Sequence, residues 1–241
     1  MAANTDPVQL QLDVVPVPDV SGFEVRVIVS GRHVLRSLQL IGMDPDDILR
    51  HGELIPPAVG ARDVVIGRCT CGEVACDSMA ISVSRTGENI VWTRPQSFGR
   101  RWPVEPVIFD ATQYLAEVDR ARNDFSWETP DRTAARLIEE RLDHSLLRSK
   151  GLRFQWGSKY SRAQHFSVSL VAEPGPYQVI LHVPWAAEEH DALVDRMLRI
   201  LTGEPGDWSD VEWIAQYDGT PVPPQQAGAR WRQWSPNVQS K

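Results

Sequence analysis

Residues 79–93 read MAISVSRTGENIVWT, and this stretch decides the fold class. Two runs rich in β-branched and aromatic residues flank residues 85–88, where Gly87 can adopt a positive φ at little steric cost. The pattern predicts a hairpin of two strands, 79–84 and 89–93. A hairpin between consecutive strands indicates antiparallel pairing rather than a succession of βαβ units.

Similar runs precede this hairpin, and helical periodicity follows it. Asp44 and Pro45 have the residue types of a helix start and predict a short helix over 43–50. Asp110 is a candidate N-cap for one later helix, and Thr129 followed by Pro130 for a second. We expect the remaining strands at 8–15, 23–29, 34–41, 64–67, 152–156, 165–171 and 177–183, and further helices at 188–201 and 207–214.

The order of strands, helices, strands and helices predicts an α+β fold, with mostly antiparallel sheets in two lobes and a central pair of helices. We expect a β-rich lobe with a cysteine turn at 1–109 and a helical hairpin at 110–149. A second α/β lobe is expected at 150–218. Residues 219–241, rich in proline, glutamine and tryptophan, are expected to form a mobile tail.

Composition restricts the partners and the compartment. The 241 residues carry a formal net charge of -7, which argues against nucleic acid because phosphate binding requires clustered Lys and Arg. No apolar run is long enough to cross a membrane, and residues 1–16 lack the features of a signal peptide. The three cysteines are too few and too close together for a disulfide framework. We therefore expect a cytoplasmic protein with no membrane and no nucleic-acid partner.

The three cysteines form a C-x-C-G-x3-C pattern, with Cys69, Cys71 and Cys76 around a glycine. A glycine after the second cysteine lets backbone N–H groups turn toward a thiolate. Three thiolates could bind Zn²⁺, with His51, Asp77 or water as the fourth ligand. Two alternatives are a tight turn in which the cysteines pack as small hydrophobic residues, and a redox or nucleophilic thiol site.

The block over 66–76, the hairpin ending at Val91 and Trp92, and residues 109–117 resemble a family of uncharacterised actinobacterial proteins. The resemblance spans about residues 25–140 and includes the C-x-C-G-x3-C turn. It implies a bacterial cytosolic origin and no known activity.

Nine tryptophans are present, and six lie at or beyond Trp156. Tryptophan is enriched at protein interfaces. We identify Trp208, Trp213, Trp231 and Trp234 as candidate interaction residues for a protein partner or for self-association. The alternative for the last two is docking of the tail onto its own chain.

No nucleotide-binding, zinc-protease, serine-hydrolase or EF-hand motif occurs in the sequence. His165 and His182 could face each other across a hairpin, but no sequence of nucleophile, base and orienting residue accompanies them. The leading hypothesis is a cytosolic protein-interaction protein, immunity-like in its acidic charge, with a structural metal at the cysteine turn. The alternative is an enzyme with an atypical thiol or zinc site.

Overall fold

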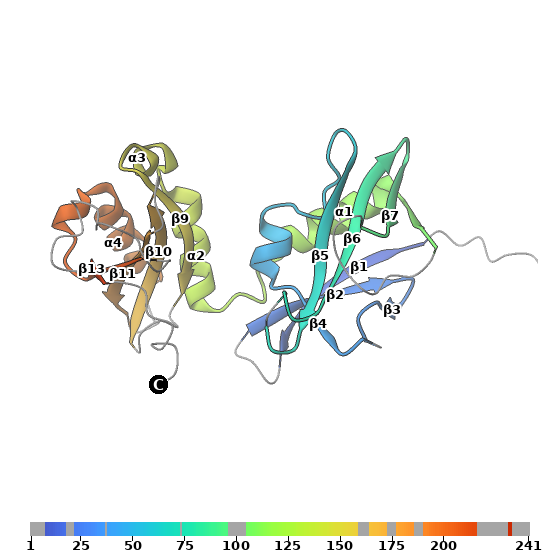
Figure 1. Ribbon diagram of the computed structural model, residues 1–241, viewed down its shortest axis with the longest axis horizontal. Coiled ribbons are helices and arrows are strands. Elements are labelled where there is room, and N and C mark those ends of the chain that lie inside the picture. The colour runs from blue at the N-terminus through green and yellow to red at the C-terminus, as the bar shows by residue number, and fades with distance from the viewer. Residues whose placement is uncertain are drawn as a thin grey trace, which may run out of the picture. The chain divides into compact units, whose positions relative to one another are not determined.

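The computed structural model describes residues 8–17, 22–36, 38–72, 74–95, 105–158, 164–172, 177–185, 190–215 and 231–232. The chain divides into two compact units, Met1–Trp127 and Glu128–Lys241 (Figure 1). Three sheets are formed by these residues, and nearly all neighbouring strands are antiparallel. The α+β prediction is confirmed.

The first unit holds two sheets, a π-helical turn and one α-helix. Its elements are β1 (Leu10–Val17), β2 (Gly22–Val29), β3 (Arg32–His33), β4 (Leu40–Gly42), η1 (Asp46–Arg50), β5 (Ala61–Cys69), β6 (Ser78–Thr86), β7 (Asn89–Thr93), β8 (Val107–Asp110) and α1 (Ala111–Asn123). One sheet has the order β1-β2-β3 and the other the order β4-β5-β6-β7-β8.

The second unit is one five-stranded sheet with its helices. Its elements are α2 (Pro130–Arg141), α3 (His144–Ser149), β9 (Leu152–Ser158), β10 (His165–Ala172), β11 (Tyr177–Pro184), α4 (His190–Thr202), the 3-10 turn η2 (Pro205–Asp207), β12 (Val211–Ala215) and β13 (Trp231–Arg232). The strand order is β13-β12-β11-β10-β9.

The boundary between the units falls within the segment 110–149, where a helical hairpin is expected. Helix α1 packs on β1, β7 and β8, whereas α2 packs on β9 and α4. The two central helices therefore each complete the core of a different unit.

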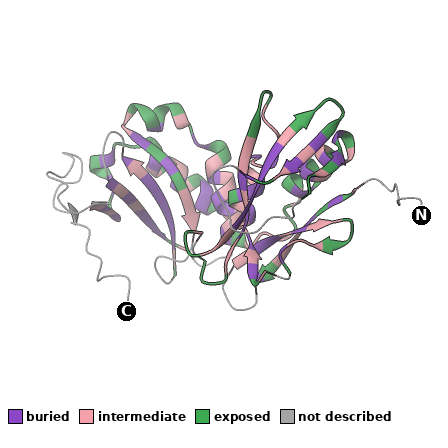
Figure 2. Cartoon of the chain, turned by 45° about the vertical axis from the view of Figure 1, so that its right-hand side comes forward, coloured by how far each residue is buried: buried purple, intermediate pink, exposed green. Residues whose placement is uncertain are grey.

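The two sheets of the first unit meet at both of their edges. The Val25 N–H donates to the Met43 carbonyl at 2.9 Å, and Val8 forms a parallel bridge with Phe109. At the first junction the backbones are so close that a Cβ on Gly42 would meet the Val25 carbonyl oxygen at 2.2 Å. Both sheets thus curve around one core, and the buried residues along their strands are drawn in purple in Figure 2.

An aromatic cluster occupies this core. Trp92, Phe109 and Tyr114 are fully buried, with centroid separations of 4.8 to 5.9 Å. The Trp92 indole donates to the Tyr114 hydroxyl at 3.1 Å, and that hydroxyl donates to the Leu54 carbonyl at 2.9 Å. Strand β7, helix α1 and the segment after η1 are tied together without an unpaired polar group in this cluster.

Three expected elements differ in the structure. The strand expected at 34–41 is present only at residues 40 and 41, in β4, and the turn before β4 places Leu35 in the core. The helix expected at 207–214 is wrong, because Val211 and Trp213 alternate into the core of strand β12 beside β11. The second central helix ends at Arg141, and a separate helix, α3, begins after its N-cap Asp143. In α3, Leu147 is buried and Leu146 is exposed.

Side chains of α1 satisfy the outer edge of β1. The Leu10 N–H and carbonyl are paired with the Gln113 amide at 3.3 and 2.9 Å. The Leu12 N–H donates to Glu117 at 2.7 Å, and the Leu12 carbonyl accepts from Arg120 at 2.7 Å. Helix side chains thus take the place of a neighbouring strand, which protects an edge that could otherwise pair with another chain.

Glu117→Gln should weaken this edge and remove a pH dependence. Burial raises the pKa of Glu117, but hydrogen bonds from Arg120 and Leu12, with the Arg120 charge, outweigh burial and hold the pKa below its ordinary value. The stabilisation is therefore complete above the unfolded-state pKa and is lost as pH falls through the folded-state pKa. We expect the variant to lose about 1–3 kcal/mol of unfolding free energy at neutral pH.

Urea unfolding at neutral pH and at about pH 3 measures this difference between wild type and variant. Asp119→Asn is the matched control, because Asp119 is exposed on the same helix. A wild-type advantage that stays the same at both pH values would contradict the assignment.

Candidate metal centre

The three cysteines lie in the loop that joins β5 to β6. Cys69 is the last residue of β5, and its N–H donates to the Asp77 carbonyl at 2.8 Å, which closes the base of the loop. The Gly72 N–H donates to the Cys69 carbonyl at 2.9 Å, and Gly72 has a φ of 91°. A side chain at position 72 would be strained in this conformation, so the glycine is what permits the tight return of the chain.

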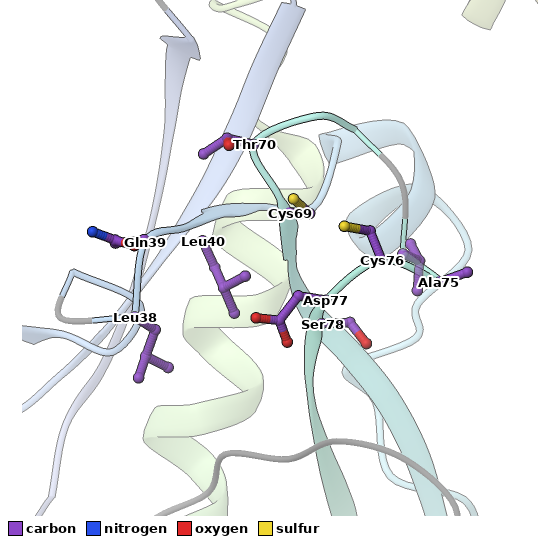
Figure 3. Close-up of a pocket in the computed structure, with 10 residues that line it drawn as sticks. Leu38, Gln39, Leu40, Cys69, Thr70, Ala75, Cys76, Asp77 and Ser78 are labelled. Carbon is purple, nitrogen blue, oxygen red and sulfur yellow. The ribbon is translucent and has the colours of Figure 1, made fainter.

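This loop brings the three sulfur atoms together. The Sγ atoms of Cys69, Cys71 and Cys76 all lie within 4.8 Å of one another, and all three are free thiols. At a Zn–S distance of about 2.3 Å, tetrahedral geometry requires sulfur atoms about 3.8 Å apart. Figure 3 shows the Cys76 sulfur directed toward Cys69. The three cysteines could therefore hold a metal ion with a small adjustment of side chains.

The sulfur atoms influence one another's protonation. Hydrogen bonds from the Cys71 backbone and from the Cys71 and Cys76 thiols lower the pKa of Cys69. The hydrogen bonds that the Cys76 thiol makes to Cys69 and Cys71, with repulsion from nearby thiolates, raise the pKa of Cys76 to about 11. Ionisation of Cys69 therefore opposes ionisation of Cys76.

The expected fourth ligands stand apart from the sulfur atoms. Among the described residues, the group of ligand atoms within 4.8 Å consists of the three sulfurs, without His51 or Asp77. Asp77 lies beside them, but its carboxylate is directed away from Cys69 and Cys76 (Figure 3). His51 is exposed at the end of η1.

A pocket of about 800 Å³ adjoins the cluster. Cys69 and Cys76 lie in its wall, and strand β4 with the residues before it forms the facing side. The lining residues are Leu38, Gln39, Leu40, Cys69, Thr70, Val74, Ala75, Cys76, Asp77 and Ser78. Sequence reasoning could not find this pocket, because it depends on the pairing of Leu40 with Cys69 across two strands.

Two of the four candidate interaction tryptophans are buried. Trp208 and Trp213 are 4% and 2% exposed and belong to the core of the second unit. The Trp208 indole donates to the Ile200 carbonyl at 2.8 Å. The backbone of Trp231 pairs with Trp213 in strand β13, so this part of the predicted tail docks on its own unit. Trp234 lies outside the described residues.

The sheet of the second unit contains a polar group that the sequence did not reveal. Strand register pairs Ser167 with His182, whose Nδ1 lies 2.8 Å from Ser167 Oγ, and His182 Nε2 lies 3.8 Å from a Glu212 oxygen. The expectation that His165 faces His182 is wrong, because His165 is paired with Pro184.

Residues 167, 182 and 212 are far apart in sequence, and only the register of three strands brings them together. Ser167 is 0% exposed and His182 is 6% exposed. A serine nucleophile must reach its substrate, and a fully buried hydroxyl does not. We assign the group to the pairing of buried polar atoms within the sheet.

Comparison with protein-family models, curated proteins and solved structures finds no match to this chain. The resemblance to actinobacterial proteins therefore stays a prediction. Within the described residues, no helix has the length and apolar character needed to span a membrane.

Trp208→Phe should destabilise the second unit without changing the association state of the protein. Phenylalanine keeps most of the apolar contact but removes the donor to Ile200, at a cost of about 1 kcal/mol of unfolding free energy. Chemical denaturation and light scattering after size exclusion measure the two properties. If Trp208→Phe loses self-association but keeps the wild-type free energy of unfolding, Trp208 is an interaction residue and this prediction is wrong.

Proposed function

We propose that this chain is a zinc-binding interaction protein, in which Cys69, Cys71 and Cys76 bind one Zn²⁺ at the turn between β5 and β6. The observation that carries the proposal is the convergence of three sulfur atoms within 4.8 Å. Thiolates are soft ligands that favour zinc, copper(I) and iron–sulfur clusters over magnesium or calcium. A single site with three nearby thiolates and no second cysteine group in the sequence favours one zinc ion over a cluster.

The exposure of the cysteines supports metal binding over packing. Cysteine is among the most frequently buried residue types when it serves as a small hydrophobic residue. Cys71 and Cys76 are exposed, and Cys69 is only half-buried. Their position in the loop therefore stabilises the fold little through apolar burial, whereas a bound ion would order the loop directly.

The same exposure supports a role for the turn in binding a protein partner. A loop ordered by zinc presents a fixed surface, and ordering before binding lowers the entropic cost of association. The net charge of -7 favours a basic partner through charge complementarity. This combination supports the interaction hypothesis, with the first unit as the contact surface in place of the buried tryptophans.

Metal content tests the zinc site. Protein purified without a histidine tag should contain about one equivalent of zinc by mass spectrometry. Cys71→Ser should lose it together with thermal stability of the first unit, because the coordination number falls and the loop is released. Thr86→Ala is the matched control: Thr86 is exposed at the end of β6 far from the cysteine loop, and the change leaves all three thiols in place.

Two results would contradict the zinc site. One is wild-type protein that binds no zinc after addition of the ion and has three rapidly titrating thiols. The other is a Cys71→Ser variant that keeps its zinc with unchanged affinity.

The interaction role predicts that partner binding depends on zinc. Association with a basic partner, or with a second copy of the chain, should weaken by about tenfold or more in Cys71→Ser and remain unchanged in Thr86→Ala. Light scattering for self-association and calorimetry with captured, purified partners measure the effect. Equal affinity of wild type and Cys71→Ser for the same partner would place the interaction surface elsewhere.

A further inference from the structure

The cysteine turn supplies three sulfur ligands, one fewer than zinc usually binds. Zinc in proteins is almost always bound by four ligands, and catalytic or ligand-exchanging sites use three side chains plus one other donor. Within the described part of the chain, three sulfur atoms form the ligand group and no histidine or carboxylate joins it. Solvent, a residue outside the described ranges such as Glu73, or another molecule can supply the fourth donor.

The pocket beside the sulfurs has the size and walls for a small cyclic donor. Its volume of about 800 Å³ lies in the range of small-molecule sites. Leu38, Leu40, Val74 and Ala75 form the apolar part of a wall that is otherwise mostly polar, and this part can contact the face of a flat ring. Cys69 and Cys76 lie in the same wall, so a ring in the pocket can approach an ion held by their sulfur atoms.

The negative charge of the proposed site favours a neutral fourth ligand. Three thiolates and one Zn²⁺ carry a net charge of -1, and the Asp77 carboxylate lines the same pocket. A further anion, such as a carboxylate or a fourth thiolate, would meet repulsion from both. A neutral nitrogen donor avoids this repulsion. An imidazole bound through one nitrogen also has a second N–H, and zinc-bound imidazoles commonly donate this N–H to a carboxylate.

We infer that the pocket lined by Leu38, Leu40 and Asp77 binds a neutral imidazole from a second molecule, which becomes the fourth zinc ligand. This inference rests on the proposed zinc site. The imidazole belongs either to a histidine side chain of a protein partner or to a small molecule. A partner histidine would couple the metal directly to the proposed interaction.

Cobalt(II) in place of zinc makes the coordination shell visible. The test uses the full chain loaded with Co²⁺ and titrated separately with 4-methylimidazole, with a short peptide that contains one histidine, and with acetate. Both imidazole donors should change the visible d–d bands with saturation, and acetate should bind about tenfold more weakly or not at all. X-ray absorption on the zinc protein should then show three sulfur ligands and one nitrogen ligand.

A variant of the pocket wall tests whether imidazole binding depends on the pocket or only on an accessible metal ion. Ala75 is an exposed residue of the pocket wall, so Ala75→Phe narrows the pocket without disturbing the core. It should weaken imidazole binding by about tenfold and leave the three-sulfur charge-transfer bands unchanged. Ala61→Phe is the matched control, because Ala61 is also exposed but lies at the opposite end of β5.

The outcomes distinguish the two proposals. Absence of cobalt–sulfur bands means that the zinc site itself is wrong. Normal cobalt–sulfur bands with no response to either imidazole donor, or an equal response in Ala75→Phe, overturn the pocket inference and leave the zinc site standing. A changed cobalt spectrum in His51→Ala, Glu73→Gln or Asp77→Asn without added donor also overturns it, because the chain would then supply its own fourth ligand.

The source of the imidazole follows from the two titrations. Tighter binding of the peptide than of 4-methylimidazole supports a histidine of a protein partner. Tighter binding of 4-methylimidazole supports a small molecule held by the pocket walls. Either result supports the imidazole as the ligand.

Discussion

The antiparallel pairing of β5 with β6 is the constraint on which the first unit and its candidate site depend. A register shift between Val65 and Gly67 carries the pairing to the end of β5, where the Cys69 N–H meets the Asp77 carbonyl at 2.8 Å. This hydrogen bond closes the base of the loop that carries the three sulfur atoms. The backbone at Gly67 also touches the core closely, since a Cβ there would lie 2.7 Å from the Leu35 side chain. The position of the cysteine turn is thus fixed by the core, although two of the cysteines are exposed.

The sheet edges of the first unit are covered by other parts of the same unit. The junction at Gly42 and Val25 leaves no room for a side chain, and Glu24 strengthens it by accepting from the Gly42 N–H at 2.7 Å. On the opposite edge, Glu117 and its neighbours on α1 replace a strand beside β1. Both devices satisfy backbone groups that would otherwise be available to another chain. Because these edges are covered, we expect a protein partner to contact the loops of the unit. Among these loops, the cysteine turn carries three thiols that could bind a metal ion.

In the proposed zinc site, the charge of the thiolates and the lining of the pocket favour the same kind of fourth ligand. The thiolates supply three donors and excess negative charge, and the pocket supplies apolar walls and a carboxylate beside them. Such a site favours a neutral donor for electrostatic reasons and a flat donor for steric ones. The group of Ser167, His182 and Glu212 differs from this site because its serine is buried. Its residue types are those of a catalytic site, but a hydroxyl with 0% exposure has no substrate to meet.

Sequence patterns alone predict the fold class, most of the elements and the three cysteines of the candidate metal centre. Local signals were sufficient there: alternating apolar residues around Gly87, the cap at Asp110, and three cysteines within eight residues around a glycine. Tertiary structure decided the rest, because those features depend on partners distant in the chain. Residues 211–215 form a strand in place of the expected helix, since β11 offers a hydrogen-bonding edge and the core accepts the alternate side chains of Val211 and Trp213. Likewise, the pocket exists only because β4 pairs with β5, and no pattern within residues 69–76 could specify what faces the sulfur atoms.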